Sequence, residues 1–339
     1  MVYKTRLAEN ARQNLGNVIP LATPYVLLVD PSNICNIRCR WCPSGHDALI
    51  KNSKRPQKIM EFELFKSIID NLNQFGTAIK VLRLYKEGEP LLNPKFPEMV
   101  SYAKHSGYVN RIDTTTNGVL LNPELNQKII DAGIDQINIS VNGVTAKQLL
   151  KNVRRNIDFE TYISNIKDLF NKRRNCTLYI KSIRDVLSER EQALFLEMFS
   201  KYADRVYLER LSPAWPDFSI KDNSGYEYDE IGNYGQPVED RSVCPYLFYI
   251  MVINSDGTVS TCVGDWKHIQ IVGDVRVNSV FNIWHGEPLK KYWVKHCAGE
   301  KDCFPMCNNC KVITHGCYDN IDSYAENVLR RLGEAVADV

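Results

Sequence analysis

Six short apolar runs recur between Tyr25 and Leu211, and amphipathic segments separate them. The runs span 25–30, 79–85, 109–116, 135–141, 177–183 and 205–210. Segments between them, such as 61–75 and 123–133, have the apolar spacing of helices. Strands that alternate with helices form parallel β/α units with right-handed crossovers. The pattern therefore predicts an α/β fold whose parallel sheet either stays open as a doubly wound fold or curves into a barrel.

Four polar loops follow the first four of these runs. "CNIRCRWCP" (35–43) follows the first, "KEGEP" (86–90) the second, "TTTNG" (114–118) the third and "SVNG" (140–143) the fourth. Ligand-binding loops lie at the carboxyl ends of parallel strands. We therefore expect the four loops to line one mouth of the sheet.

Composition and charge exclude several classes of protein. The 339 residues carry 42 basic and 40 acidic side chains, with no basic stripe of the kind that binds nucleic acid. No run approaches the roughly 18 apolar residues of a membrane span, and the N-terminus lacks the apolar core of a signal peptide. We predict a cytoplasmic protein that binds neither nucleic acid nor membrane.

Ten of the eleven cysteines fall in two groups, at 35–42 and 244–317. In a reducing compartment, clustered cysteines more often hold metal or do redox chemistry than form disulfides. Cys176 stands alone, and we expect it to be a buried apolar thiol.

The first group places Cys35, Cys39 and Cys42 in a C-x3-C-x2-C spacing without a fourth cysteine nearby. A structural zinc site would need four protein ligands, and His46 is the one nominal candidate close by. A 4Fe–4S cluster held by three cysteines leaves one iron open to a substrate or cofactor. The spacing favours the cluster.

The loop "CNIRCRWCP", with Trp41 before its third cysteine, resembles the signature loop of the radical S-adenosylmethionine enzymes. The resemblance implies a partial (β/α)6 barrel in which S-adenosylmethionine chelates the open iron. It also implies reductive cleavage of that cofactor to a 5′-deoxyadenosyl radical, which abstracts hydrogen from a substrate. An external electron donor such as flavodoxin or ferredoxin would reduce the cluster.

The other loops extend the resemblance. "GEP" is similar to the family's Gly-Gly-Glu-Pro motif, which implies that Gly88 and Glu89 contact the methionine amino group. This sequence departs from the motif at Glu87, where the first glycine is usual. Asn117 and Ser140 match family positions near the cofactor. We predict Arg184, just after the fifth strand, as a partner for the cofactor carboxylate.

A stretch rich in Gly, Pro, Asp and Tyr at 212–240 suggests a boundary between a domain at 1–240 and a second at 241–339. The second begins with a predicted β-hairpin that turns at Asp256-Gly257. A helical segment and a cysteine-rich tail follow.

This second part is similar to the SPASM/twitch extensions that bind auxiliary 4Fe–4S clusters in one branch of the family. The shortened version implies one cluster on four cysteines, and the unassigned thiols leave two clusters open. A zinc ribbon is the alternative reading of the tail. The four proposed ligands are Cys244, Cys262, Cys307 and Cys310, and the unassigned thiols are Cys297, Cys303 and Cys317.

The family branch includes dehydrogenases of small cyclitols and sulfatase-maturating enzymes. We predict an oxidoreductase that oxidises an alcohol of a small polyol, sugar or aminocyclitol, with an auxiliary cluster as electron acceptor. Proton transfer would fall to Glu209, Arg210 or Lys181, at or near strand ends. About 24 residues precede the first strand, which favours a small substrate over a peptide. Peptide modification, radical epimerisation and a zinc-stabilised module without catalysis are the alternatives.

Overall fold

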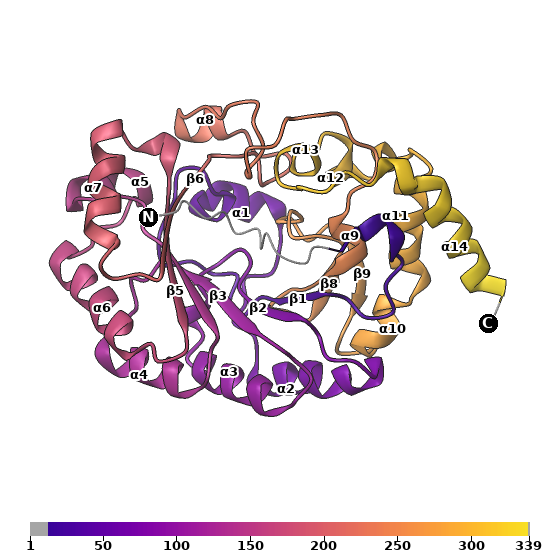
Figure 1. Cartoon of the computed structure of the whole chain (residues 1–339), viewed down its shortest axis with the longest axis horizontal. Helices are drawn as coiled ribbons and strands as arrows, with labels where there is room; N and C mark the ends of the chain where they lie inside the picture. The colour runs from indigo at the N-terminus through magenta and orange to yellow at the C-terminus, as the bar shows by residue number, and fades with distance from the viewer. Residues whose placement is uncertain (1–12, 338–339) are drawn as a thin grey trace.

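The computed structural model describes residues 13–337, so most of the N-terminal stretch considered for a signal peptide lies outside the described residues. Its centre is one curved, open sheet in the order β6-β5-β4-β3-β2-β1-β7-β8-β9 (Figure 1). The first six strands are parallel and match the six predicted runs. They are β1 (Val26–Val29), β2 (Val81–Leu84), β3 (Ile112–Thr116), β4 (Gln136–Ser140), β5 (Thr177–Ile183) and β6 (Arg205–Glu209). The sheet is therefore a partial barrel, as predicted.

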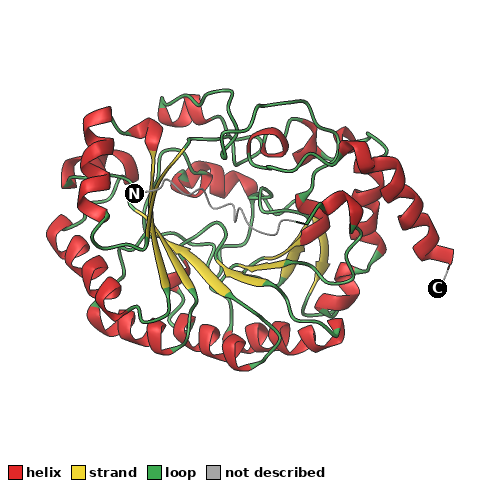
Figure 2. Cartoon of the chain, viewed as in Figure 1, coloured by secondary structure: helices red, strands yellow, loops and turns green. Residues whose placement is uncertain are grey.

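Helices cover the convex face of this sheet, whereas loops and the short helix α1 (Asp47–Ser53) lie on the concave side (Figure 2). The covering helices are α2 (Phe62–Asp70), α3 (Phe96–His105), α4 (Pro123–Asp131), α6 (Phe159–Lys172) and α7 (Glu189–Phe199). The short helix α1 follows the cysteine loop in the sequence, and the end of α5 (Ala146–Val153) is hydrogen-bonded to that loop.

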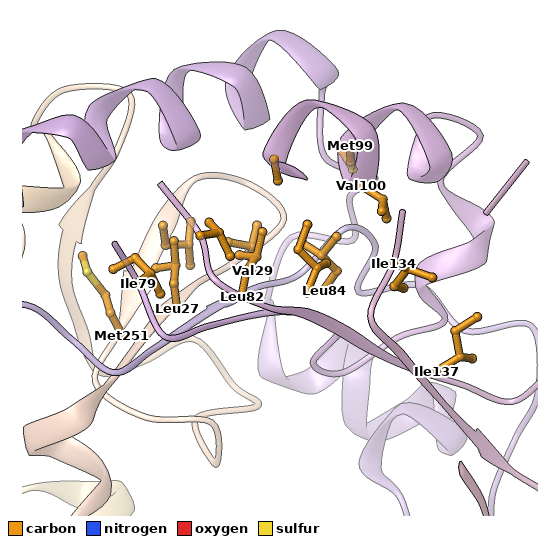
Figure 3. Close-up of a cluster of buried hydrophobic side chains, with 14 of the residues drawn as sticks. Leu27, Val29, Ile79, Leu82, Leu84, Met99, Val100, Ile134, Ile137 and Met251 are labelled. Atoms are coloured by element: carbon orange, nitrogen blue, oxygen red, sulfur yellow. The ribbon is translucent and has the colours of Figure 1, made fainter. Parts of the chain in front are cut away.

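Alternating residues of the strands supply the core. Leu27 and Val29 of β1 lie with Leu82 and Leu84 of β2 in one buried cluster, which Met99 of α3 joins (Figure 3). Successive side chains of a strand point to opposite faces, so the intervening residues face the interior of the barrel. On β1 the intervening residues Val26 and Leu28 form a second hydrophobic cluster with Ile250 and Val252.

The predicted hairpin is present, and it extends the barrel sheet. Strand β7 (Ile250–Ile253) pairs antiparallel with β8 (Thr258–Ser260) through a turn in which Gly257 has φ 91°. Strand β7 also pairs in parallel with β1, and β9 (Ile271–Asp274) completes the edge. The division at 240/241 stays a prediction, but both parts contribute to one sheet and one core.

The remaining helices follow β6 in the chain. The predicted helical segment after the hairpin is split, because the chain turns at Gly286 before Pro288 enters the first turn of the next helix. No helix within residues 13–337 is both long and apolar enough to cross a membrane. These elements are α8 (Ile220–Ser224), α9 (Tyr246–Tyr249), α10 (Val280–Trp284), α11 (Glu287–Cys297), α12 (Pro305–Asn308), α13 (Val312–His315) and α14 (Ala325–Ala337).

Candidate active site

The loops after β1 to β4 line one cavity of about 230 Å³, as their predicted positions require. Side chains from β5, β6 and the 212–240 stretch complete its wall. Of the residues proposed for the site, the cavity is lined by Cys35, Cys39, Trp41, Cys42, Gly88, Glu89, Asn117, Ser140, Lys181 and Glu209. Residues far apart in the sequence thus meet in one place.

The three cysteines of the first group have an environment that suits metal ligation. Burial raises the pKa of Cys35 to about 12, and burial together with the neighbouring thiols raises the pKa of Cys39. Three such thiolates would repel one another unless bound cations compensated them. Asn142 Nδ2 lies 3.8 Å from Cys39 Sγ, and Asn117 Nδ2 lies 3.9 Å from Cys35 Sγ. Amide donors of this kind stabilise the sulfurs of an iron–sulfur cluster.

Two glycines let other backbone segments approach the cysteine loop. A Cβ atom on Gly88 would lie 2.1 Å from the Ser32 carbonyl oxygen, and one on Gly45 would lie 2.1 Å from the Cys39 carbonyl oxygen. Neither position has room for a side chain. The "GEP" loop is therefore packed directly on the segment that leads into the first cysteine.

Glu89 connects the ends of two strands. Its carboxylate accepts hydrogen bonds from Thr116 Oγ1 (2.6 Å), the Asn117 backbone N–H (2.8 Å) and the Leu91 backbone N–H (3.1 Å). Burial nevertheless raises the pKa of Glu89 to about 7. A cationic ligand in the cavity would favour its ionised form. The hydrogen bonds show that Glu89 positions the ends of the neighbouring loops. Its contact with the ammonium group of the cofactor stays a prediction.

Arg184 is placed differently from the other proposed cofactor contacts. Its guanidinium is paired with Asp185 (2.8 Å) and Asp229 (3.1 Å), and it does not line the cavity. Hydrogen bonds to Asp185 raise the pKa of Arg184. Any contact with a cofactor carboxylate would require these pairs to rearrange.

A second chamber of about 220 Å³ adjoins the cavity. The two share Trp41, Ile183 and Trp215, together with the ion pair of Lys181 and Glu209. Lys181 Nζ lies 2.6 Å from Glu209 Oε2. Arg210 lines only the second chamber, where it is bonded to Asp229. Two of the three proposed proton-transfer residues thus stand where the two spaces meet.

The four proposed ligands of the second cysteine group come together in the structure, and their ligation of a cluster stays a prediction. Burial and the charges of Cys310, Cys307 and Cys244 raise the pKa of Cys262, so all four thiols lie within electrostatic reach of one another. Helix α9 lies between Cys244 and β7. Gln270 Nε2 donates to Cys307 Sγ at 3.6 Å.

The remaining thiols separate into distinct environments. Cys317 is buried and hydrogen-bonded to Cys244, which raises the pKa of Cys244. Cys297 is buried on α11, and Cys303 is exposed. Cys176 is buried in the core, as predicted. His46, the nominal zinc ligand, lies 2.9 Å from the Arg40 carbonyl oxygen through its Nε2.

Within residues 13–337, no three Cys, His, Asp or Glu side chains are close enough to hold a single metal ion. The sulfurs around one zinc ion stand about 4 Å apart, because each Zn–S bond is about 2.3 Å. A four-iron cubane separates its cysteine sulfurs more widely. The donor chemistry of both thiol groups fits such a cluster, and the residues present can accommodate it.

Sequence reasoning missed three features of the cavity wall. Asn142 lies in the quoted "SVNG" loop, so its position at a strand end was an available signal. Trp215 comes from the expected linker, where no motif marks it. Lys86 belongs to a buried network that depends on the extension, which only the tertiary structure reveals.

Family comparisons agree with this geometry. Residues 29–194 match the profile of the radical SAM superfamily, and residues 244–311 match SPASM, an iron–sulfur cluster-binding domain. The chain belongs to the radical SAM superfamily. Its predicted cofactors, 4Fe–4S clusters and S-adenosylmethionine, follow from these two domains, and they favour iron over zinc at both thiol groups.

Individual relatives differ in what they do. This radical SAM protein is 24% identical to a probable GTP 3′,8-cyclase of Methanococcus maripaludis, over 80% of this chain and 93% of that one. Its fold resembles BtrN in complex with AdoMet and 2-DOIA (TM-score 0.56, 15% identity, 88% and 97% coverage). It also resembles SuiB of Streptococcus suis bound to its precursor peptide SuiA (TM-score 0.60, 13% identity, 81% and 67% coverage). At these identities the structural matches establish the fold alone.

Proposed function

We propose that this radical SAM enzyme oxidises an alcohol group of a small polyol, sugar or aminocyclitol. In this proposal one electron passes to a single auxiliary 4Fe–4S cluster, held by the four cysteines of the second group. The observation that carries the proposal is the Lys181–Glu209 ion pair. It lines both the cofactor cavity and the adjoining chamber, so the pair would contact a substrate in the chamber at the side that faces the cofactor.

When bound, the clusters and S-adenosylmethionine supply a radical that removes a hydrogen atom from the carbinol carbon and an acceptor for the electron that follows. The alcohol must also lose its hydroxyl proton to become a carbonyl. The Glu209 carboxylate can accept that proton, and the Lys181 ammonium 2.6 Å away balances its charge beforehand. Hydrogen atom, proton and electron together account for the two-electron oxidation.

The chamber suits a small substrate without negative charge. At about 220 Å³ it is smaller than the roughly 300–1,000 Å³ of pockets for drug-sized ligands. Its basic side chains are already paired, Lys181 with Glu209 and Arg210 with Asp229. A triphosphate would instead call for several cations directed at its oxygens. This charge balance supports a polyol over a nucleotide of the kind named for the M. maripaludis relative.

A peptide substrate is the second candidate. A groove of about 540 Å³ runs along 213–230 and reaches Asn309 and Lys311, and Trp215 lines both this groove and the chamber. Such a groove could hold an extended chain. Epimerisation has less support, because the described walls of the cavity and chamber do not include Cys297, Cys303 or Cys317 as a hydrogen donor.

The test is an anaerobic assay of reconstituted protein with a panel of polyols, aminocyclitols and peptides. We expect a carbonyl product in proportion to 5′-deoxyadenosine. Glu209→Gln should reduce product formation by about 10²–10⁴-fold while cofactor cleavage persists. Glu197→Gln, an exposed carboxylate on α7, is the matched control. Deuterium uptake from solvent without oxidation would instead indicate an epimerase, and a modified peptide would overturn the polyol assignment.

A further inference from the structure

Glu87 occupies the motif position at which this chain departs from the family, and its side chain is buried. The carboxylate lies 2.6 Å from Lys86 Nζ, 3.3 Å from Arg55 Nη1 and 2.9 Å from His268 Nε2. Each of these four side chains is at most 3% exposed. A glycine could make none of these contacts.

The partners of Glu87 come from three different parts of the molecule. Arg55 donates to Ser44 Oγ (3.0 Å), two residues after the third cysteine of the radical site, and to the Trp266 carbonyl (2.9 Å). Lys86 donates to Asn254 Oδ1 (2.7 Å) and the Asp265 carbonyl (3.1 Å). The network therefore joins the cysteine loop, the cofactor loop and the extension.

The same network continues to the auxiliary site. Asp265 is fully buried, and its carboxylate accepts the backbone N–H of Gln270 at 3.0 Å. Gln270 in turn donates to Cys307 Sγ at 3.6 Å. An unbroken path of polar contacts thus runs from Ser44, beside the radical site, to a thiol of the auxiliary site.

The charges in this path make it rigid. Burial alone would raise the pKa of Glu87, but Lys86, His268 and Arg55 outweigh burial and lower it to about 2. Removing one partner of such a buried group leaves the others uncompensated. His268 also adopts a left-handed backbone conformation, φ 55°, which is unfavourable for a histidine without tertiary support. Its contact with Glu87 supplies that support.

We propose that Glu87 is a positioning residue that couples the S-adenosylmethionine loop to the auxiliary site, so that an intact auxiliary site strengthens cofactor binding. Glu87 adjoins Gly88 and lines the cofactor cavity, whereas His268 belongs to the extension and does not line it. Coupling between two sites is reciprocal and needs a physical connection with differential contacts. The proposal rests on cofactor binding by the family and is independent of the substrate.

The test is equilibrium dialysis of anaerobically reconstituted full-length protein with S-adenosylmethionine. His268→Asn suits the left-handed backbone but is too short to reach Glu87. We expect it to weaken cofactor binding at least fivefold, with iron content unchanged. Lys267→Gln is the matched control, because it breaks a more exposed pair with Asp217 in the same loop, and it should leave the affinity unaltered.

A mutant cycle separates coupling from local damage. Cys307→Ala, at the far end of the path, should weaken cofactor binding in the parent but have no further effect in Glu87→Gln. Glu87→Asp, which keeps the charge, should restore part of the affinity that Glu87→Gln loses, and this comparison decides the matter if His268→Asn does not fold. Parental affinity in folded His268→Asn, or additive effects of Cys307→Ala and Glu87→Gln, would overturn the proposal. Failure to oxidise polyols would leave these affinities unchanged.

Discussion

The two thiol groups of this protein are built in opposite ways. The first lies on one loop of eight residues after β1, and its three cysteines open onto a cavity. The second is assembled from α9, the hairpin and the tail, so that its thiols come from segments as distant as Cys244 and Cys310. The difference is that between a site that must admit a ligand and one that encloses its metal.

The contrast also concerns how each site is supported. Backbone segments pack directly on the first group at positions where a side chain would clash, as at Gly45 and Gly88. The second group depends on side-chain hydrogen bonds, such as those of Gln270 and Cys317. Substitutions at Gly45 and Gly88 should therefore act through shape, and substitutions at Gln270 and Cys317 through hydrogen bonding.

Removing the first group should have the largest effect. We expect Cys35→Ala, Cys39→Ala and Cys42→Ala together to abolish cleavage of S-adenosylmethionine, because no ligand would hold the iron that the cofactor chelates. Iron in anaerobically prepared protein should fall from about eight to about four per chain. Iron and acid-labile sulfide analysis measures both values. A fall from about twelve to about eight would show two auxiliary clusters.

The sequence identified the first site better than the second for a physical reason. Cys35, Cys39 and Cys42 are close in space because they are close in the chain, and the strand pattern placed their loop at the mouth of the sheet. The parallel pairing of β7 with β1 is a long-range contact that no local pattern encodes.

The same reasoning explains which site residues were missed or misplaced. Glu87 could be noted as a departure, but its partner His268 lies 181 residues away. Arg184 was expected at the cofactor from its position after β5, yet Asp229 of the 212–240 stretch pairs with it. Strand-end positions are predictable from periodicity, whereas ion-pair partners depend on how distant segments pack.

Gly88→Ala should damage the first site and spare the second. The new methyl group would meet the carbonyl oxygens of Ser32 and Ile34 at 2.1 and 2.4 Å, so the cofactor loop must move. We expect a loss of about 1–3 kcal/mol in stability and at least tenfold weaker cofactor binding, with auxiliary iron retained. Gly333→Ala, on α14 with no atom within 4 Å of the new Cβ, is the control for the methyl group alone. Equal loss of iron from both sites would contradict the prediction that Gly88→Ala damages only the first.

Asp30 tests the junction between the barrel and the extension. It directly follows β1, the strand that pairs with β2 of the barrel and with β7 of the extension. Burial and the nearby charge of Glu87 raise its pKa to about 7, against the opposing effect of Lys86. Its carboxylate is fully buried, and the backbone N–H of Ser32 lowers its pKa only in part. Since the folded pKa exceeds the ordinary value of 3.8, the folded state is stabilised while the Asp30 carboxyl is protonated. This contribution to stability is complete below about pH 4 and is lost as the pH rises through 7.

Asp30→Asn keeps the shape and removes the ionisation. We expect the variant and the parent to differ little in thermal midpoint near pH 4, and the variant to become the more stable as the pH rises, by up to a few kcal/mol at pH 8. Asp47→Asn, at an exposed position, controls for surface charge. A parent protein that gains stability over the variant between pH 5 and 8 would show that Asp30 serves as a needed counter-charge for Lys86 or Arg55.

The smallest effect is expected at Cys317. Substituting it distinguishes a cluster ligand from a hydrogen-bond partner in the second site. Its thiol is bonded to Cys244, and its backbone carbonyl accepts from Arg241 (2.8 Å) and Gln236 (3.1 Å), so the residue is fixed beside the thiol group. If Cys244 is the ligand and Cys317 only its hydrogen-bond partner, Cys317→Ser should retain auxiliary iron and cost about 0.5–1.5 kcal/mol. Cys244→Ser should lose the cluster. Because both serines keep a polar hydroxyl, iron analysis of the pair isolates ligation, and iron loss in Cys317→Ser would reverse the two roles.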